Sequence, residues 1–182
     1  MSKPKDSVRR GLVMVFTGDG KGKTTAALGL GLRAWGQGMR VLVLQFLKSP
    51  SWPAGEREAV RRLEGFEIRP LGLGFVRGRG EDELRPHREA ARQALTVARE
   101  AVAGGEWDLV VLDEIFVALS LGLLAEEDLH AILDARSPSL HLALTGRGAP
   151  ETVVTRADLV TEMREVKHHY THGIKAQKGI EY

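Results

Sequence analysis

The chain has 182 residues, of which 43% are hydrophobic and 27% are charged, a balance typical of a soluble globular protein. Its formal net charge is only +2, so we expect no nucleic-acid partner. The chain has no cysteine, which excludes disulfides, thiol catalysis and cysteine-ligated zinc. We expect one cytoplasmic domain over 1–182, with a flexible arm over 1–10, a tail over 164–182, no secretory signal and no membrane-spanning segment.

Short apolar runs alternate with helical patterns along the chain, which predicts parallel β–α–β units. The expected strands cover 12–16, 41–46, 66–69, 107–112, 140–145 and 159–163. The expected helices cover 23–35, 55–63, 85–103 and 126–135, and another begins near 150. The glycine-rich stretch over 70–84 is predicted to be a long mobile loop. We therefore expect an α/β fold of the P-loop NTPase (RecA-like) type, with a mainly parallel sheet and helices on both faces.

The segment between the first expected strand and the first helix carries most of the functional information. It reads Thr17-Gly18-Asp19-Gly20-Lys21-Gly22-Lys23-Thr24-Thr25, which is the strand–loop–helix context of a phosphate-binding P-loop. Glycines let backbone N–H groups turn toward phosphate oxygens, and the helix N-terminus adds partial positive charge. Lys23 is expected to reach the terminal phosphates, Thr24 to bind Mg²⁺, and Lys21 to add a second cation. The alternative is a glycine-rich turn that caps a helix and binds nothing.

Two further strand ends carry chemistry. The strand over 107–112 is followed by Asp113 and Glu114, and in P-loop proteins we expect such a strand beside the P-loop strand, with its acids facing the magnesium region. One or two carboxylates suffice there because Mg²⁺ usually keeps several waters. Arg147 follows the strand over 140–145 and lies either against phosphate or in a surface turn. Trp52 lies in a proline-bounded loop, where exposure and ligand contact are expected.

Several segments together resemble one family. They are the P-loop, Gln45-Phe46-Leu47-Lys48, Leu112-Asp113-Glu114, Thr145-Gly146-Arg147-Gly148-Ala149-Pro150 and the run from Asp158 to Tyr182. From about residue 11 onward the chain is similar to the P-loop class of ATP:corrinoid adenosyltransferases, which act on cob(I)alamin or cob(I)yrinic acid a,c-diamide. The resemblance implies attack of cobalt(I) of a reduced corrinoid on the 5′-carbon of ATP and release of inorganic triphosphate. It also implies that ATP is held in a sense reversed from ordinary ATPases.

The resemblance assigns roles to residues of this chain. Lys21, Lys23 and Arg147 would stabilise the triphosphate, residues Thr17 to Thr25 would bind the nucleotide, and Thr24, Asp113 and Glu114 would hold Mg²⁺. Phe75 would face the corrinoid, but Arg77 stands where the family commonly has tryptophan, so the corrinoid half of the site departs from the family pattern. The expected partners are a second copy of the chain, as a homodimer, and a flavoprotein reductant.

Three other functions remain open at this point. A kinase or NTPase performing ordinary phosphoryl transfer would release ADP. A nucleotide-dependent nucleic-acid-binding module would need a basic face, against which the near-neutral charge counts. A regulatory nucleotide-binding protein would bind ATP without turnover.

Overall fold

The computed structural model describes residues 10–76, 78 and 80–181, so the expected arm over 1–10 lies, except for Arg10, outside the described residues. Among them, six strands form one sheet in the order β3-β2-β4-β5-β1-β6, and neighbouring strands pair in parallel. The strands are β1 (Val13–Thr17), β2 (Val41–Gln45), β3 (Phe66–Pro70), β4 (Leu109–Asp113), β5 (His141–Thr145) and β6 (Leu159–Glu162).

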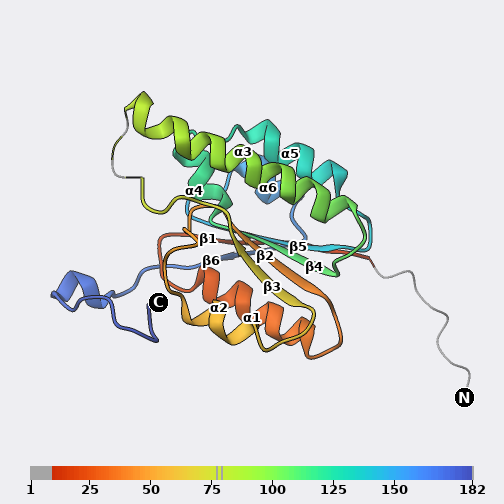
Figure 1. Ribbon diagram of the computed structural model, residues 1–182, viewed down its shortest axis with the longest axis horizontal. Helices are drawn as coiled ribbons and strands as arrows, with labels where there is room; N and C mark the ends of the chain where they lie inside the picture. The colour runs from red at the N-terminus through yellow and green to blue at the C-terminus, as the bar shows by residue number, and fades with distance from the viewer. Residues whose placement is uncertain (1–9, 77, 79, 182) are drawn as a thin grey trace, which may run out of the picture.

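Helices cover both faces of this sheet, which confirms the predicted α/β class (Figure 1). On one face lie α1 (Lys23–Trp35) and α2 (Gly55–Val60). On the other lie α3 (Glu81–Ala103), α4 (Ile115–Ser120), α5 (Glu126–Ala135) and α6 (Glu151–Arg156). A short 3₁₀ helix, η1 (His169–His172), lies in the tail that follows β6. None of the helices in the described ranges is both long and apolar enough to span a bilayer.

The core consists of two apolar layers, one on each side of the sheet. In β2, Leu42 and Leu44 join the cluster that includes the buried residues of α3, α4 and α5, whereas Val41 and Val43 join the cluster that includes those of α1. This alternation follows from the two-residue side-chain period of a strand. All of β2 and β4 is buried, which explains their nearly continuous apolar sequences.

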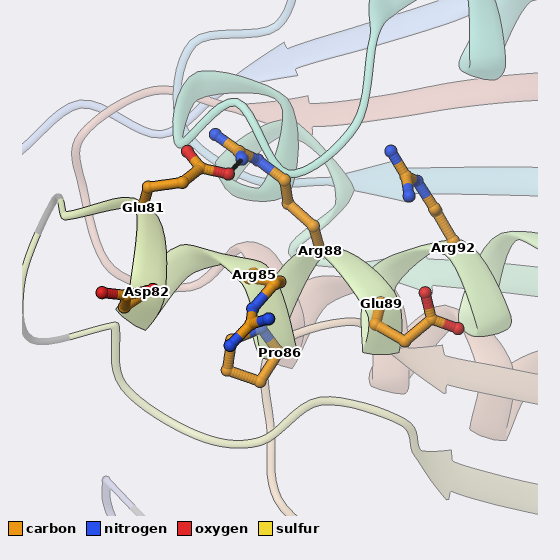
Figure 2. Close-up of a pocket in the computed structure, with 7 residues that line it drawn as sticks. All are labelled: Glu81, Asp82, Arg85, Pro86, Arg88, Glu89 and Arg92. Atoms are coloured by element: carbon orange, nitrogen blue, oxygen red, sulfur yellow. Dashed lines mark hydrogen bonds and ion pairs between the residues drawn. The ribbon is translucent and has the colours of Figure 1, made fainter.

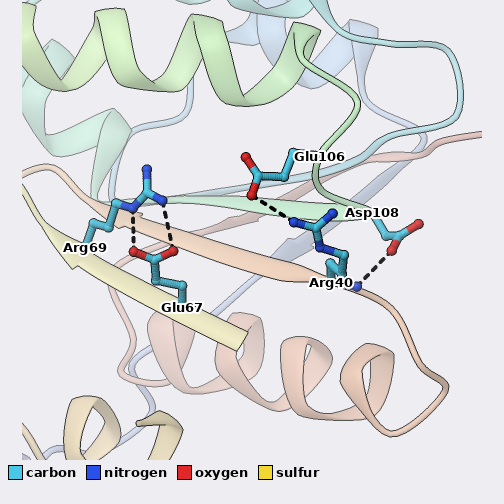
Figure 3. A network of polar contacts seen from close by, with 5 residues as sticks. All are labelled: Arg40, Glu67, Arg69, Glu106 and Asp108. Carbon is cyan, nitrogen blue, oxygen red and sulfur yellow. Dashed lines mark hydrogen bonds and ion pairs between the residues drawn. The ribbon is translucent and has the colours of Figure 1, made fainter. Parts of the chain in front are cut away.

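The β3 edge of the sheet carries charged side chains. Arg69 donates two hydrogen bonds to Glu67, at 2.7 and 2.8 Å, along this outer strand (Figure 3). Arg40, at the start of β2, donates to Glu106 through its guanidinium and to Asp108 through its backbone N–H, both at 2.8 Å. Charges on an outer strand discourage pairing with another chain. We assign the contacts of Arg40 with Glu106 and Asp108 a structural role, because they lie just before β2 and β4, at the opposite end of these strands from Gln45 and Asp113.

The strand order corrects one prediction. β4, which ends in Asp113, does not adjoin β1; β5 lies between them. Strand order depends on contacts between distant parts of the chain, which local patterns do not report. The acid still reaches the P-loop region because α1 packs across β1, β5 and β4, so that its first turn lies near the ends of all three strands.

Two further predictions were wrong in detail. Helix α3 begins at Glu81 rather than at 85, since three acidic residues in its first turn favour the positive end of a helix. The predicted long mobile loop is correspondingly shorter, and its first part is held by backbone hydrogen bonds from Leu71, Gly72 and Gly74 to the segment that ends β2. Helix α4 was missed because its six residues are too few to show a clear helical period.

Candidate functional site

The P-loop joins the end of β1 to the start of α1. Gly18 (φ 91°) and Gly22 (φ 122°) adopt the left-handed backbone region that favours glycine. Gly22 directly precedes α1, a helix of 13 residues, so the loop ends at the positive end of a helix. Thr17, before the loop, accepts a hydrogen bond from the backbone N–H of Ala149 at 3.2 Å, which ties the P-loop to the turn that follows β5. This local structure suits an anion.

Lys23 lies within its own loop. Its Nζ donates to the carbonyl oxygens of Gly18 and Gly20, both at 2.7 Å. Burial, followed by the charge of Arg147, lowers the pKa of Lys23. An anion bound between these two cations would therefore favour the charged form of the lysine.

Asp113 is a buried hydrogen-bond acceptor at the end of β4. Its Oδ1 accepts from the hydroxyls of Thr24, at 2.7 Å, and Thr145, at 2.8 Å. Its Oδ2 accepts from Nε2 of Gln45 at 3.3 Å. The carboxylate thus fixes the Thr24 hydroxyl in the first turn of α1 and joins the ends of β2, β4 and β5.

Glu114 is the one residue other than glycine, among those described, with a positive φ (64°). Such backbone is costly for a side-chain-bearing residue and is often found at functional sites. Its N–H donates to the hydroxyl of Thr145 at 2.9 Å, and its side chain lines the cavity described below. Burial, and then the nearby Asp113, raises the pKa of Glu114. Cations oppose this rise in part: Lys48, Lys23 and Arg147.

The oxygen atoms of Thr24, Asp113 and Glu114 form a donor set of the chemical kind that Mg²⁺ prefers. Thr24 and Asp113 are in direct contact, and a cation beside Glu114 would favour its charged form by Coulomb attraction, against the burial that raises its pKa. Among the residues that the structure describes, no cluster of three or more histidine or acidic side chains could enclose a metal. These residues therefore fit an ion whose coordination is completed by phosphate oxygens and water.

A cavity of about 790 Å³ opens beside the P-loop. Four cationic residues line it, Lys21, Lys23, Lys48 and Arg147, together with Glu56, Glu114 and Glu181. Part of the lining is apolar, and the following residues contribute to it: Leu28, Leu47, Trp52, Phe75, Val76, Val117 and Leu121. One space therefore offers charges for phosphates and an apolar surface for a second, non-polar group.

Two aromatic rings lie together on the apolar wall. Trp52, from the loop after β2, and Phe75, from the loop after β3, have ring centroids 4.7 Å apart with planes tilted by 51°. Phe75 is 76% exposed and Trp52 is 38% exposed, so both keep accessible surface. Gly74 lies against the indole: a Cβ there would come within 2.9 Å of the Trp52 ring. The close approach of these two loops thus depends on a glycine.

The structure brings most of the predicted site residues together. The cavity is lined by Lys21, Gly22, Lys23, Thr24, Thr25, Phe75, Glu114 and Arg147. Asp113 lies behind Thr24, while Thr17, Gly18, Asp19 and Gly20 belong to the P-loop without lining the cavity. Arg77, which replaces the family tryptophan, lies outside the described residues.

Sequence reasoning did not assign three charged residues of the cavity. Lys48 donates to Glu56 at 3.0 Å, and although burial raises the pKa of Glu56, the hydrogen bond from Lys48 contributes to a net lowering. Lys48 could have been found, because it follows a buried strand whose end faces the same edge as the P-loop. Glu181 accepts from Lys21 at 2.8 Å across 160 residues of sequence, and no local pattern signals such a contact.

A second, shallower cavity of about 450 Å³ lies on the outer side of α3 (Figure 2). Its lining is almost entirely charged: Glu81, Asp82, Arg85, Pro86, Arg88, Glu89 and Arg92. Arg88 is paired with Glu81, and Glu89 accepts a hydrogen bond from Gln93 at 3.1 Å. It shares no lining residue with the P-loop cavity, and its internal pairing is that of a solvated helix face.

Comparison with known proteins gives concordant results. The sequence model of the family described as "ATP:corrinoid adenosyltransferase BtuR/CobO/CobP" matches residues 9–182. A protein of Escherichia coli K12 named corrinoid adenosyltransferase is 38% identical over 176 residues, covering 95% of this chain and 86% of that protein. The corrinoid adenosyltransferase CobA of Salmonella typhimurium is 40% identical over 174 residues, with the same coverage. The corrinoid adenosyltransferase of Pseudomonas aeruginosa is 41% identical over 174 residues, covering 95% and 84%.

Among solved structures, the RadB recombinase superposes with a TM-score of 0.50 at 16% sequence identity. The match covers 88% of this chain and 78% of that chain. At this identity the likeness concerns the fold alone, and it confirms the predicted RecA-like P-loop architecture.

Proposed function

Because the chain belongs to the ATP:corrinoid adenosyltransferase family, we propose that it transfers the 5′-deoxyadenosyl group of ATP to the cobalt(I) of a reduced corrinoid. Inorganic triphosphate is the second product. Ordinary phosphoryl transfer by a kinase or NTPase is not favoured, since the three relatives compared above are named as corrinoid adenosyltransferases.

One observation carries this proposal within the structure: the P-loop cations and the aromatic pair line the same cavity. A triphosphate requires several cations and backbone donors, as the P-loop supplies. A corrin ring is large, roughly planar and apolar over much of its surface, and it requires an extensive apolar wall. The apolar part of the lining, with its accessible aromatic pair, offers a surface of this kind.

In the proposed reaction, cobalt(I) donates an electron pair to the 5′-carbon of ATP. A cobalt–carbon bond forms, the bond from C5′ to the phosphate oxygen breaks, and its electron pair leaves with the triphosphate. No proton is transferred and cobalt(I) is itself a strong nucleophile, so the protein need not supply a general base. Its tasks are to hold C5′ in line with cobalt and to stabilise the charge that develops on the leaving oxygen.

The cationic residues at and beside the P-loop suit the stabilisation of charge on the leaving triphosphate. Lys23 and Arg147 are close enough for Arg147 to lower the pKa of Lys23, and developing negative charge between them would offset their repulsion. Lys21 adds a third positive charge at the rim of the same cavity. We assign the triphosphate to this group of cations.

Magnesium forms part of the proposal. Thr24, Asp113 and Glu114 would hold the ion, which would supply charge neutralisation of the phosphates when bound. Hydrogen bonds already position these ligands. Asp113 accepts from the Thr24 hydroxyl and so orients it, and the Thr145 hydroxyl accepts from the backbone N–H of Glu114.

We also propose an electron donor, a cellular location and an oligomeric state for the protein. A flavoprotein is proposed as the electron donor that supplies cobalt(I), because the proposed reaction starts from reduced cobalt and itself includes no step that reduces it. A cytoplasmic location suits an ATP-dependent enzyme without cysteine. A homodimer is supported by β6, the outer strand beyond β1, where Leu159 and Val160 are 44% and 42% exposed.

The test is the identity of the phosphate product. With ATP, Mg²⁺ and chemically reduced cobalamin under anaerobic conditions, phosphorus NMR should show inorganic triphosphate appearing as ATP disappears. ADP as the main product would overturn the proposal in favour of phosphoryl transfer. ATP that is bound but unchanged would overturn it in favour of a regulatory nucleotide-binding protein.

A further inference from the structure

The tail after β6 begins against the P-loop. The N–H of Gly20 donates to the carbonyl of Met163 at 2.7 Å, and the N–H of Met163 donates to the carbonyl of Thr17 at the same distance. The packing is too close for side chains: a Cβ at Gly18 would lie 2.5 Å from the Met163 carbonyl oxygen, and one at Gly20 would lie 2.7 Å from the Arg164 backbone. The first residues of the tail are therefore fixed on the loop.

The other end of the tail returns to the same loop. Oε2 of Glu181 accepts a hydrogen bond from Nζ of Lys21 at 2.8 Å. Oε1 of Glu181 lies 3.5 Å from Nε2 of His169 in η1. The Glu181 side chain is only 19% exposed, although its neighbours in the tail are mostly open to solvent. In Figure 1 the tail projects from the sheet and its end turns back toward the start of α1.

Glu181 thus places a negative charge in the cavity that we assign to the phosphates. The hydrogen bond from Lys21 lowers the pKa of Glu181, so the carboxylate is ionised at neutral pH. Gly179, Ile180 and Glu181 line the same cavity as Lys23 and Arg147. A bound triphosphate would place several negative charges near this carboxylate and would compete with it for Lys21.

We propose that Glu181 sets the affinity of the site for the phosphate chain by competing with it for Lys21. This inference rests on the proposed function, and the proposed chemistry gives it a purpose. In phosphoryl transfer the nucleotide loses one phosphate with its negative charge, so the P-loop binds the nucleotide product less tightly than it binds ATP. In adenosyl transfer all three phosphates remain together on the leaving group. A P-loop that binds ATP through its phosphates therefore holds the product as firmly, and a carboxylate that returns to Lys21 favours release.

The experiment compares the full-length protein with Glu181→Gln, a nearly isosteric variant that removes only the charge. The probe is inorganic tripolyphosphate with Mg²⁺, titrated by isothermal calorimetry. The variant should bind it about two- to tenfold more tightly, as expected for loss of one partly exposed charge. Glu165→Gln, on the exposed part of the same tail, is the matched control and should bind as the wild type does. In a Lys21→Met background, the effect of Glu181→Gln should shrink.

Kinetics give a second readout that a merely structural role would not produce. Glu181→Gln should have a lower steady-state rate relative to the rate of its own first turnover, because triphosphate leaves more slowly. Equal or weaker tripolyphosphate binding by Glu181→Gln would overturn the inference. If wild-type protein releases triphosphate normally while Glu181→Gln binds the probe as the wild type does, this inference alone fails. If no triphosphate is formed by either protein, the proposed function fails.

Discussion

Lys23 joins the two halves of the P-loop and faces the cavity. Its ammonium bridges the carbonyls of Gly18 and Gly20, which closes the loop around it. Burial and the charge of Arg147 lower the pKa of Lys23. An anion bound there would neutralise the two positive charges and stabilise the charged form of the lysine. We therefore expect phosphate stabilisation to depend on this residue more than on any other cation of the cavity.

Replacing Lys23 by alanine should lower the rate of triphosphate formation by at least about 100-fold, the usual effect of removing a donor to developing negative charge. The measurement is a single-turnover rate at saturating ATP and cob(I)alamin. Lys167→Ala, on the exposed tail, is the control and should retain the wild-type rate. A Lys23→Ala protein that reacts almost normally would contradict the assignment of triphosphate to this loop.

Glu114 gives a prediction about pH. Its pKa is raised by burial and by Asp113, so folding disfavours its charged form. The resulting loss in the free energy of unfolding is absent at low pH, where Glu114 is protonated in both the folded and the unfolded state. It grows as the pH rises from about 4.3, the ordinary pKa of a glutamate, through the raised pKa of the folded protein.

Glu114→Gln should therefore increase the free energy of unfolding at neutral pH, without ATP or Mg²⁺, and the gain should vanish as the pH falls below about 4. Urea unfolding at a series of pH values measures this difference. Glu127→Gln, on the exposed side of α5, serves as the control. A gain that stays constant over the whole pH range would show that the charge of Glu114 is not its cause.

The loops that follow β2 and β3 are joined to each other. Backbone hydrogen bonds join Gly72 to Lys48 and Gly74 to Leu47, and the rings of Trp52 and Phe75 meet at the outer end. Neither loop contributes to the P-loop. We therefore expect changes to the aromatic pair of these loops to affect the apolar substrate and to leave nucleotide binding nearly intact.

Phe75→Ala should raise the apparent KM for cob(I)alamin about three- to tenfold, the effect expected for loss of one aromatic contact, while the affinity for ATP stays within twofold. Leu73→Ala is a matched control, because Leu73 is exposed in the same loop but does not line the cavity. Steady-state kinetics and ATP titration give the two quantities. A large loss of ATP affinity would mean that the loop serves the nucleotide instead.

For the whole molecule, the two outer strands of the sheet differ in character. β3 carries Glu67 and Arg69, whereas all four residues of β6 are exposed and include Leu159 and Val160. The tail that follows β6 also carries exposed large hydrophobic residues, among them Val166, Tyr170 and Ile174. A surface of this kind is favourable only when it is covered.

Equilibrium sedimentation should therefore give twice the chain mass of 19.9 kDa. Val160→Lys should shift the protein toward the monomer, because it places a charge in the proposed contact. Gln37→Lys, beyond the end of α1, adds the same charge elsewhere and should leave the mass unchanged. A wild-type protein that sediments as a monomer at micromolar concentration would contradict the homodimer.

The sequence predicted those parts of the fold that depend on neighbouring residues. The P-loop, the bounds of α1 and α5 and the apolar central strands follow from local patterns. The position of β5 between β1 and β4 does not, because it depends on packing between distant segments. The same distinction holds in the site. Lys23 and Thr24 are readable from spacing, whereas the contact of Glu181 with Lys21 exists only once the tail has folded back.

The fate of cobalt(I) tests adenosyl transfer most directly. Under anaerobic conditions with ATP and Mg²⁺, the absorbance of cob(I)alamin should decay in the presence of the protein. The product should be a light-sensitive adenosyl-corrinoid, formed in equal amount to triphosphate. A cobalt(I) band that persists while ATP is consumed would contradict adenosyl transfer as the reaction of this cavity.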